Sequence, residues 1–251
     1  MIKASIIITC YNYEQYIEEA IEHAVNQKFD KKEFEIIVIN DGSSDRSNFI
    51  IDKYKNVVRA YHLKNQGLEK AANFGIDQAE GVYLTRVDAD DYLELNYLES
   101  MVPVLDNNKD LSFAYSDYYK LKGHNKTKIS LPEFDVQEII KRGDFLATGT
   151  LFRKDILSMV GRYNEDVINC GLENYELLLK MLVQFKLIGH HVNLPLFNYR
   201  IHNANMSLKR RKAIIDYGNR LCASLGLGSY STNEFHPYQL VIKEGDYNAK
   251  Q

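Results

Sequence analysis

The chain has 251 residues, of which 45% are hydrophobic and 26% charged, so it is long enough to form one large α/β domain with a substantial core. Its formal net charge of −3 gives no global basic field, and we therefore expect no nucleic acid among its partners. Three widely spaced cysteines without a CxxC pair are typical of a reducing compartment. The amino-terminal residues lack a signal-peptide pattern, and no apolar run is long enough to span a bilayer. These features predict a cytoplasmic protein.

The first part of the chain alternates between strand-like and helix-like patterns. Apolar, β-branched runs predict strands at 2–9, 34–39, 57–63 and 82–87. Apolar residues at helical spacing predict helices at 14–27, after the polar turn 40–45, and at 67–79. This alternation is typical of a doubly wound, mostly parallel sheet flanked by helices. Ligands bind beyond the carboxyl ends of such strands, where the polar loops 9–12, 40–42 and 88–91 fall.

The pattern changes after residue 91. Helices are expected at 93–105, 135–141, 173–185 and 207–225, the last with a serine cap. A strand is expected at 111–115, and strand-like runs over 187–199 are interrupted by Pro195. Residues 124–132 are expected to form a polar loop, and the run 145–152 contains small residues at 148–150. The adjacent His190 and His191 would face opposite sides of a strand, so we expect a structural role for both. Without a linker or repeat, the sequence predicts a single domain at 1–229 and a polar tail at 230–251.

An acidic motif, Asp88-Ala89-Asp90-Asp91, stands at the end of the apolar run 82–87. Three acids at the end of a buried strand concentrate negative charge where desolvation is costly, so the site needs a counter-charge. Carboxylates suit Mg²⁺ or Mn²⁺, which complete their shells with water and substrate phosphate. The motif therefore indicates a metal–diphosphate site. A solvated acidic turn before a helix remains the alternative.

Motifs in chain order carry a resemblance to a known family. They are TCYN at 9–12, NDGSSD at 40–45, NQG at 65–67 with NFGI at 73–76, GVYL at 81–84 and DADD at 88–91, followed more weakly by GTLF at 149–152, GRYNE at 161–165, ENYE at 173–176 and YRIH at 199–202. Together they resemble the family 2 glycosyltransferases of GT-A fold, an α/β fold with a Rossmann-like, mostly parallel central sheet. The resemblance implies a nucleotide-sugar half at 1–105 and a smaller acceptor-side half at 106–229, which includes the C-terminal helix.

The resemblance also implies a reaction. It is an inverting transfer of a sugar from a nucleotide diphosphate donor, most simply a UDP-sugar, to a hydroxyl of a saccharide or lipid-linked acceptor in the synthesis of surface polysaccharide, lipopolysaccharide or glycolipid. A divalent metal, Mn²⁺ or Mg²⁺, would neutralise charge on the departing diphosphate. Matched to the family motifs, Asp90 would hold the metal, supported by Asp91 and by His202.

Residues around the nucleotide are matched in the same way. Asp41 matches the residue that reads the nucleobase edge, Thr9 and Tyr11 match the loop around the base, and Asp88 would face the ribose or a metal-bound water. The full nucleotide-binding set is Thr9, Tyr11, Asn12, Asp41, Lys70, Asp88 and Ala89. Each of three residues also has an ordinary structural alternative. Asp41 could form a turn, Thr9 could simply end a strand, and Tyr11 could pack at the edge of the sheet.

Two departures from the family pattern affect the chemistry. An acceptor hydroxyl needs a base, and the family places an aspartate where this chain has Asn174, which cannot accept a proton. The candidate bases are Glu173 and Glu176, with Asp166 as a further acid. Alternatively, Glu173 and Glu176 have no catalytic role and are acids at the start of a helix, where the helix dipole favours them.

The second departure concerns a missing cation. The family commonly has arginine where this chain has Ala72, so a side chain that could reach the diphosphate is absent. Lys70 is a possible substitute, and Arg86 could act as a charge partner beside the acidic motif.

Three further interpretations stay open. The basic run 209–212 could touch anionic lipid, which would make the protein peripheral to the inner face of a membrane, or could be a solvated helix face. The two departures are also compatible with a nucleotide-sugar-binding module that has lost turnover. A sugar-phosphate nucleotidyltransferase is disfavoured, because residues 9–16 contain no glycine, lysine or arginine to cradle a triphosphate. The sequence carries no indication of oligomeric state.

Overall fold

A nine-stranded sheet forms the centre of the computed structural model, which describes residues 1–143, 149–203, 205, 209–227, 232, 236 and 238. The strand order is β3-β2-β1-β4-β8-β6-β9-β5, with β7 paired to β6. The strands are β1 (Ala4–Cys10), β2 (Phe34–Asn40), β3 (Arg59–His62), β4 (Tyr83–Asp88), β5 (Tyr92–Leu93), β6 (Phe113–Lys122), β7 (Asn125–Ile129), β8 (Leu151–Arg153) and β9 (Gly189–Ile201). The helices are α1 (Ile17–Val25), α2 (Ser47–Asp52), α3 (Leu68–Gln78), α4 (Tyr97–Asn107), α5 (Val136–Arg142), α6 (Lys154–Met159), α7 (Glu173–Leu179), the π-helical η2 (Lys180–Gln184) and α9 (Arg211–Ser224).

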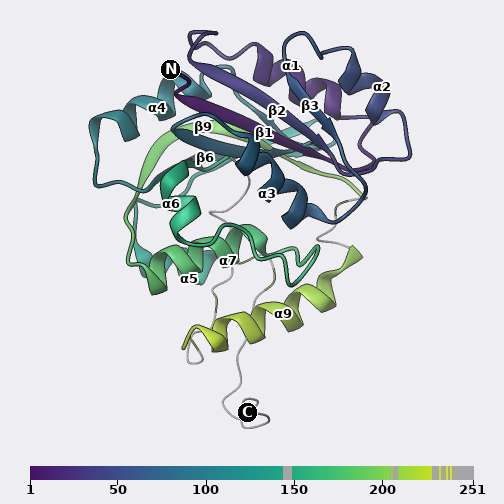
Figure 1. Cartoon of the computed structure of the whole chain (residues 1–251). Helices are drawn as coiled ribbons and strands as arrows, with labels where there is room; N and C mark the ends of the chain where they lie inside the picture. The colour runs from purple at the N-terminus through teal and green to yellow at the C-terminus, as the bar shows by residue number, and fades with distance from the viewer. Residues whose placement is uncertain are drawn as a thin grey trace.

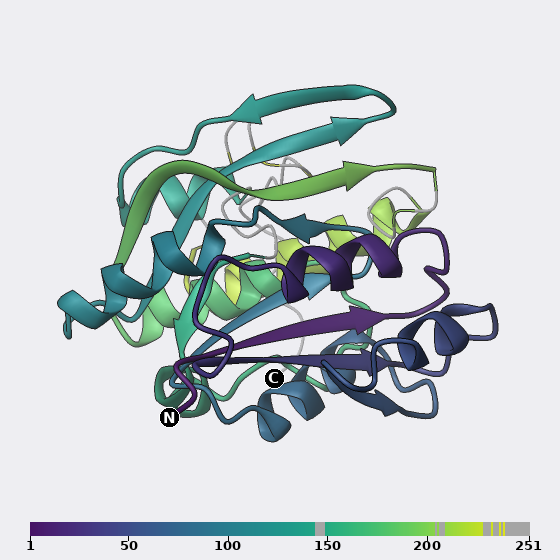
Figure 2. The same ribbon diagram turned by 90° about the horizontal axis from the view of Figure 1, so that it is seen from above.

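The first four large strands form the predicted parallel sheet. β1 is buried along its whole length and pairs in parallel with β2 and β4, while β2 pairs in parallel with β3. Thr9 lies opposite both Ile39 and Asp88, so the carboxyl ends of three strands meet at one edge. Figure 2 shows the arrowheads of β1 and β2 at this edge, which we call the rim. The α/β fold predicted from the sequence is confirmed.

Helices cover both faces of the sheet. In Figure 1, α1, α2 and α4 lie above the sheet, α3 and α6 lie below it, and α7 and α9 lie further below. The upper helices present apolar faces to the core; in α1 these are Ile17, Ala20, Ile21 and Ala24. α3 packs with its small residues toward the sheet, and a Cβ on Gly75 would lie 2.5 Å from the Cγ2 of Ile7. A glycine at this position therefore lets the helix approach β1 closely.

The second half of the chain differs from the prediction in its strands. The loop predicted at 124–132 is wrong, because β7 forms a hairpin with β6 around Gly123, whose φ is +58°. β7 is exposed and polar, so it carries no apolar pattern. β9 continues through Pro195, where the pairing with β6 shifts register at Asp117 and accommodates a residue without an N–H. Around β8 the pairing is antiparallel, which makes this half of the sheet mixed.

The helices of this half follow the expected pattern more closely. Asp135 caps α5 by accepting a hydrogen bond from the Glu138 N–H at 2.9 Å. The helix expected at 173–185 is α7 continued by η2, and α9 begins at Arg211 with Arg210 at its N-cap. His190 is exposed and His191 is buried, so the two face opposite sides as predicted. The serine cap expected at 207, part of the run 145–152 and most of the tail 230–251 lie outside the described residues.

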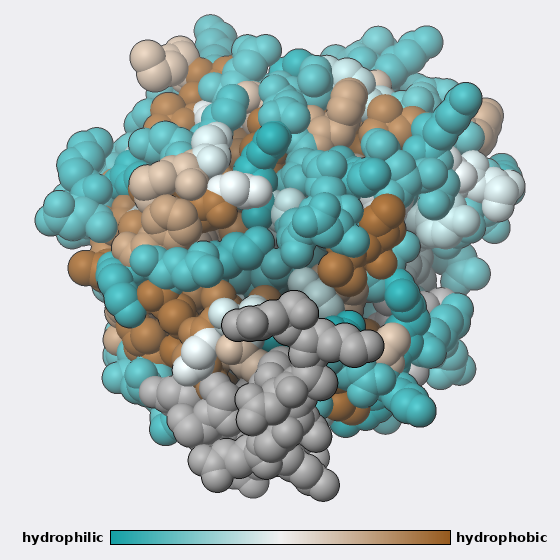
Figure 3. All heavy atoms as spheres, turned by 60° about the horizontal axis from the view of Figure 1, so that its bottom comes forward, coloured by the Kyte–Doolittle hydropathy of each residue, from teal (hydrophilic) through white to brown (hydrophobic). Residues whose placement is uncertain are grey.

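Within the described ranges, no helix combines the length and the apolar character needed to cross a bilayer. Figure 3 brings the lower side of Figure 1 forward and shows apolar patches separated by hydrophilic side chains.

The packing of the parallel half leads to a stability prediction. Ile37 in β2 is 0% exposed, whereas Ile188, just before β9, is 50% exposed. We expect Ile37→Ala to lower the free energy of unfolding by about 2–5 kcal/mol, because it removes buried methyl groups and leaves a cavity. Ile188→Ala, the matched control, should change it by about 0.5 kcal/mol or less. Urea unfolding measures both, and equal losses would contradict the described core.

Candidate active site

The acidic motif lies at the rim and is covered by the end of β9. β4 ends at Asp88, and the side chains of Asp90 and Asp91 are 6% and 3% exposed. Asp91 Oδ1 accepts a hydrogen bond from the Arg200 N–H at 2.8 Å. Asp90 Oδ2 lies 2.9 Å from His202 Nε2 and accepts from Asn205 Nδ2 at 3.3 Å. Of the three residues that the sequence proposed for a metal, the structure brings Asp90 and His202 together, whereas Asp91 is bound to the backbone of Arg200.

His202 is held by aromatic neighbours from the segment before α1. Its ring centroid lies 5.9 Å from that of Tyr13 and 5.0 Å from that of Tyr16. Burial, and then the charges of Asp90 and Asp88, raise the pKa of Tyr13, so this phenol stays protonated. The carboxylate and imidazole of Asp90 and His202 form a donor set suited to Mn²⁺ or Mg²⁺ with water and phosphate completing the shell.

A second cluster has the spacing of a metal site but not its chemistry. Among the described residues, ligand atoms of Glu69, Cys170 and Glu173 lie within 4.8 Å of one another. Both carboxylate oxygens of Glu69 already accept backbone N–H groups, and Glu173 is paired with an arginine. Burial also raises the pKa of the Cys170 thiol, which opposes the thiolate that a metal requires. These groups do not fit a metal ion.

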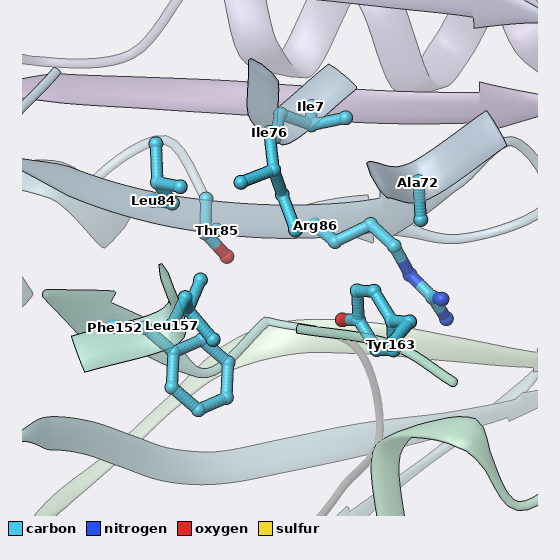
Figure 4. Close-up of a pocket in the computed structure, with 9 residues that line it drawn as sticks. All are labelled: Ile7, Ala72, Ile76, Leu84, Thr85, Arg86, Phe152, Leu157 and Tyr163. Carbon is cyan, nitrogen blue, oxygen red and sulfur yellow. The ribbon is translucent and has the colours of Figure 1, made fainter. Parts of the chain in front are cut away.

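A buried arginine joins the acidic motif to the candidate base. Arg86 is 5% exposed, and its Nη2 lies 3.3 Å from Asp88 Oδ2 and 2.9 Å from Glu173 Oε1. Its guanidinium lies over the Tyr163 ring, 5.1 Å from the centroid. Figure 4 shows Arg86 reaching past Ala72 toward Tyr163, on the wall of a small pocket between β1, α3, β4, β8 and α6. Arg86 thus places a cation beside the position where the family has its arginine.

Asp88 faces both the arginine and β1. Its Oδ1 accepts a hydrogen bond from Thr9 Oγ1 at 2.9 Å, so Thr9 and Asp88 lie together as the sequence predicted for neighbouring strand ends. Burial raises the pKa of Asp88 to about 6, although the Arg86 charge opposes the shift. A further cation at the rim would favour the charged form of this carboxyl.

The proposed nucleobase residues lie at the neighbouring loops. Asp41 is 4% exposed, and its two oxygens accept the N–H groups of Gln66 and Gly67, both at 2.9 Å. Burial raises the pKa of Asp41 and these two hydrogen bonds oppose the shift. Tyr11 is 49% exposed on the rim, where its ring offers an open flat face.

The remaining members of the nucleotide set contribute less directly. Asn12 has a φ of +58° and its Oδ1 accepts from the Ser44 N–H at 2.8 Å, so it joins two rim loops. Ala89 is 0% exposed and its N–H donates to the Thr9 carbonyl at 2.9 Å, so it connects the acidic motif to the end of β1. Lys70 is half-buried in the first turn of α3.

The three acids considered as bases have different surroundings. Glu173 is 7% exposed; its Oε1 accepts from Arg86, and Asn174 Nδ2 lies 3.4 Å from the same oxygen. Glu176 is 3% exposed and accepts from Asn164 and Lys180, both at 2.9 Å, and from the Tyr217 hydroxyl at 2.6 Å. Glu176 therefore anchors α9 to α7, and Asp166 is exposed. Glu173 alone of the three touches a residue that also contacts the acidic motif.

Sequence reasoning missed several residues of the site. Asn205 and Arg200 contact Asp90 and Asp91, and Tyr13 and Tyr16 flank His202. Arg200 lies within the quoted YRIH motif, and the spacing of Tyr13 and Tyr16 is about one helical turn, but neither pattern specifies a partner more than 100 positions away. These contacts follow from the path of β9 rather than from a local pattern.

Comparison with known proteins identifies the family of the chain. The family model described as "Glycosyl transferase family 2" matches residues 5–161. This chain belongs to glycosyl transferase family 2. It is also 30% identical, over 231 residues, to the Escherichia coli protein WfaP, named a UDP-Glc:alpha-D-GlcNAc-diphosphoundecaprenol beta-1,3-glucosyltransferase, with 90% of this chain and 88% of WfaP covered.

Solved structures show the same fold. The Staphylococcus aureus TarS 1–349 structure with UDP-GlcNAc matches with a TM-score of 0.73 at 20% identity, covering 88% of this chain and 66% of that one. The Pyrobaculum calidifontis mannosyltransferase PcManGT, solved with GDP-Man and Mn²⁺, matches with a TM-score of 0.66 at 13% identity, covering 96% and 68%. The chain spans only 31–58% of the length of four other curated relatives that it matches. The GT-A fold inferred from the motifs is confirmed.

The buried arginine gives the site's stability prediction. Arg86→Met removes the cation but keeps much of its volume, which leaves the buried Glu173 without its cation and Asp88, whose side chain is 27% exposed, without its ion pair. We expect a loss of about 3–5 kcal/mol in the free energy of unfolding at neutral pH. Lys53→Met is the control, because the Lys53–Glu18 pair is 46% and 47% exposed and should contribute about 1 kcal/mol or less. Urea unfolding that gave the same small loss for both variants would contradict the buried pairing.

Proposed function

We propose that this chain transfers a sugar, with inversion, from a UDP-sugar to a hydroxyl of a saccharide or lipid-linked acceptor in cell-surface glycan synthesis. The observation that carries the proposal is the cluster in which Arg86 joins Asp88 of the acidic motif to Glu173. This cluster puts a donor-side acid and a candidate base on one buried cation. Family membership, the activity for which WfaP is named and the UDP-GlcNAc bound to TarS support the choice of reaction and donor.

The donor would lie along the rim with its base near the loops after β1 and β2. Asp41, Thr9 and Tyr11 surround this end, where Asp41 is buried and Tyr11 offers an exposed ring. The diphosphate would then face Asp88–Asp91. The three acids of this motif would repel a diphosphate, so productive binding needs a cation between them.

Asp90 and His202 would hold that cation, with Asp91 fixed behind them by the Arg200 backbone. Bound there, Mn²⁺ or Mg²⁺ supplies positive charge to the oxygens of the departing diphosphate. The Mn²⁺ in the PcManGT structure supports a metal in this fold.

Glu173 would remove the proton from the acceptor hydroxyl. Its Oε1 is held by Arg86 and Asn174, while among the described residues Oε2 takes no hydrogen bond. Fixing one oxygen orients the other, which can then accept a proton from a hydroxyl within hydrogen-bond reach. Asn174, which cannot act as a base, instead supports Glu173. This arrangement favours a working enzyme over a module that only binds the donor.

The acceptor and the cellular location are part of the same proposal. Residues Lys209, Arg210, Arg211 and Lys212 at the start of α9 are all exposed. Such a run can contact anionic lipid, which suits a cytoplasmic enzyme working at the inner face of a membrane on a lipid-linked acceptor.

Metal-dependent nucleotide binding provides one test. We expect UDP to raise the melting temperature only weakly alone and strongly with Mn²⁺, because a ligand at 100 times its Kd stabilises by about 2.7 kcal/mol. Asp90→Asn should remove the Mn²⁺-dependent part of the shift. Asp52→Asn changes an exposed acid of α2 that is paired with His62, and this variant should keep the Mn²⁺-dependent shift. An unchanged Mn²⁺-dependent shift in the Asp90 variant would disprove the metal assignment.

The assignment of the base is tested by a second pair of variants. We expect Glu173→Gln to lower the rate of UDP release from UDP-glucose or UDP-GlcNAc, with an acceptor present, by about 10²–10⁴-fold while UDP binding is retained. Asp166→Asn is the matched control, an exposed acid in the preceding loop, and should retain the wild-type rate. The reverse result would move the base to Asp166, and no UDP release by the wild-type protein would favour the binding-only alternative.

A further inference from the structure

Two segments 100 positions apart in the sequence lie against each other below the rim. One is the start of α3 at Gly67–Glu69, and the other is the loop that leads into α7. Gly67 has a φ of +98°, and a Cβ there would lie 2.0 Å from the Cγ2 of Ile168. The contact is therefore backbone against side chain, with no room for a larger residue.

Hydrogen bonds connect these segments in both directions. Glu69 Oε2 accepts the Asn169 N–H at 2.6 Å, and Glu69 Oε1 accepts the Cys170 N–H at 2.9 Å. In return, Asn169 Oδ1 accepts the Leu68 N–H at 3.0 Å and so caps α3 from another part of the chain. Asn169 has a φ of +54°, a conformation that asparagine tolerates better than most residues. We call this set of three hydrogen bonds the α3 latch.

The chemistry of Glu69 points to a specific role. Its side chain is 0% exposed, and among the described residues no cation forms an ion pair with it. A buried carboxylate is costly, and here the first turn of α3 and two backbone N–H groups compensate it. An apolar side chain would fill the space without that cost but would leave both N–H groups unsatisfied. The carboxylate therefore fixes the backbone of the loop.

The latch lies between the two ends of the candidate active site. On one side, Asp41 binds the N–H groups of Gln66 and Gly67, directly before the latch. On the other side, Glu173 begins α7 three residues after Cys170, and side-chain atoms of Glu69, Cys170 and Glu173 lie within 4.8 Å of one another. We propose that Glu69 is a positioning residue that fixes the backbone carrying Glu173 to the nucleotide-binding loop. This inference rests on the proposed role of Glu173.

Glu69→Gln tests the proposal with little change in volume. The amide keeps one acceptor oxygen but turns an NH₂ group toward the second N–H, which breaks one of the three hydrogen bonds of the latch. We expect kcat for UDP release with acceptor to fall by about 10–100-fold, because a small misplacement of a reacting group has effects of this size. The KM for the UDP-sugar and the Kd for UDP should stay within about twofold, because Glu69 acts through Glu173.

Glu35→Gln is the matched control. Glu35 lies near the amino end of β2, away from the rim, and its carboxylate accepts from Ser5 Oγ at 2.7 Å and from the Glu80 N–H at 2.5 Å. Unlike Glu69 it also forms an ion pair, with Arg59 at 2.6 Å. Glu35→Gln should therefore lose at least as much stability as Glu69→Gln but keep the wild-type kcat. Amide hydrogen exchange is the second readout: residues 169–172 should exchange faster in Glu69→Gln than in the wild type or in Glu35→Gln.

The outcomes separate this inference from the proposed function. Wild-type kcat together with unchanged exchange at 169–172 in Glu69→Gln would overturn the inference and leave the function standing. A fall of kcat equal to that of Glu35→Gln would show a general stability effect and would also overturn it. If the wild-type protein released no UDP from any UDP-sugar, the proposed function would fail, and the exchange rates would still show whether the latch holds the loop.

Discussion

The active-site region depends on one buried cation. Arg86 is 5% exposed and pairs with Asp88 of β4 and Glu173 of α7. These two acids are 85 positions apart in the sequence. Glu173 would be costly to leave unpaired at this depth, and the guanidinium would be equally costly without the two acids. The two ion pairs therefore fix the position of α7 relative to the parallel half of the sheet. The shape of the rim depends on that position.

α3 makes the same connection through backbone contacts. Its inner side approaches β1 at Gly75, and its outer side carries Asn73, whose amide exchanges two hydrogen bonds with the Tyr163 backbone. Glu69 binds the loop before α7 in a similar way. Tyr163 in turn lies under the Arg86 guanidinium. The charged pair and the helix thus support the same loops, and this explains why polar side chains are retained in a layer that is otherwise apolar.

Local patterns in the sequence predicted most elements of the first half of the fold. The apolar β1, β2 and β4 strands and the amphipathic α1 were predictable because their periodicity reflects burial on known faces. β7 was missed because an exposed polar hairpin has no such periodicity, and β9 was interrupted at Pro195 because a register shift is a property of the pairing. The acidic motif could be located, but Asn205 on Asp90 and Arg86 on Glu173 are contacts between distant segments. No spacing rule specifies them.

The most direct test of the account is a crystal structure of the protein with UDP and Mn²⁺. The account predicts the metal on Asp90 and His202, the uridine near Asp41 and Tyr11, and Glu173 Oε1 still bound to Arg86. A metal bound elsewhere, with Arg86 turned away from Glu173 onto the diphosphate, would contradict the central claim that this arginine holds the acid that acts on the acceptor.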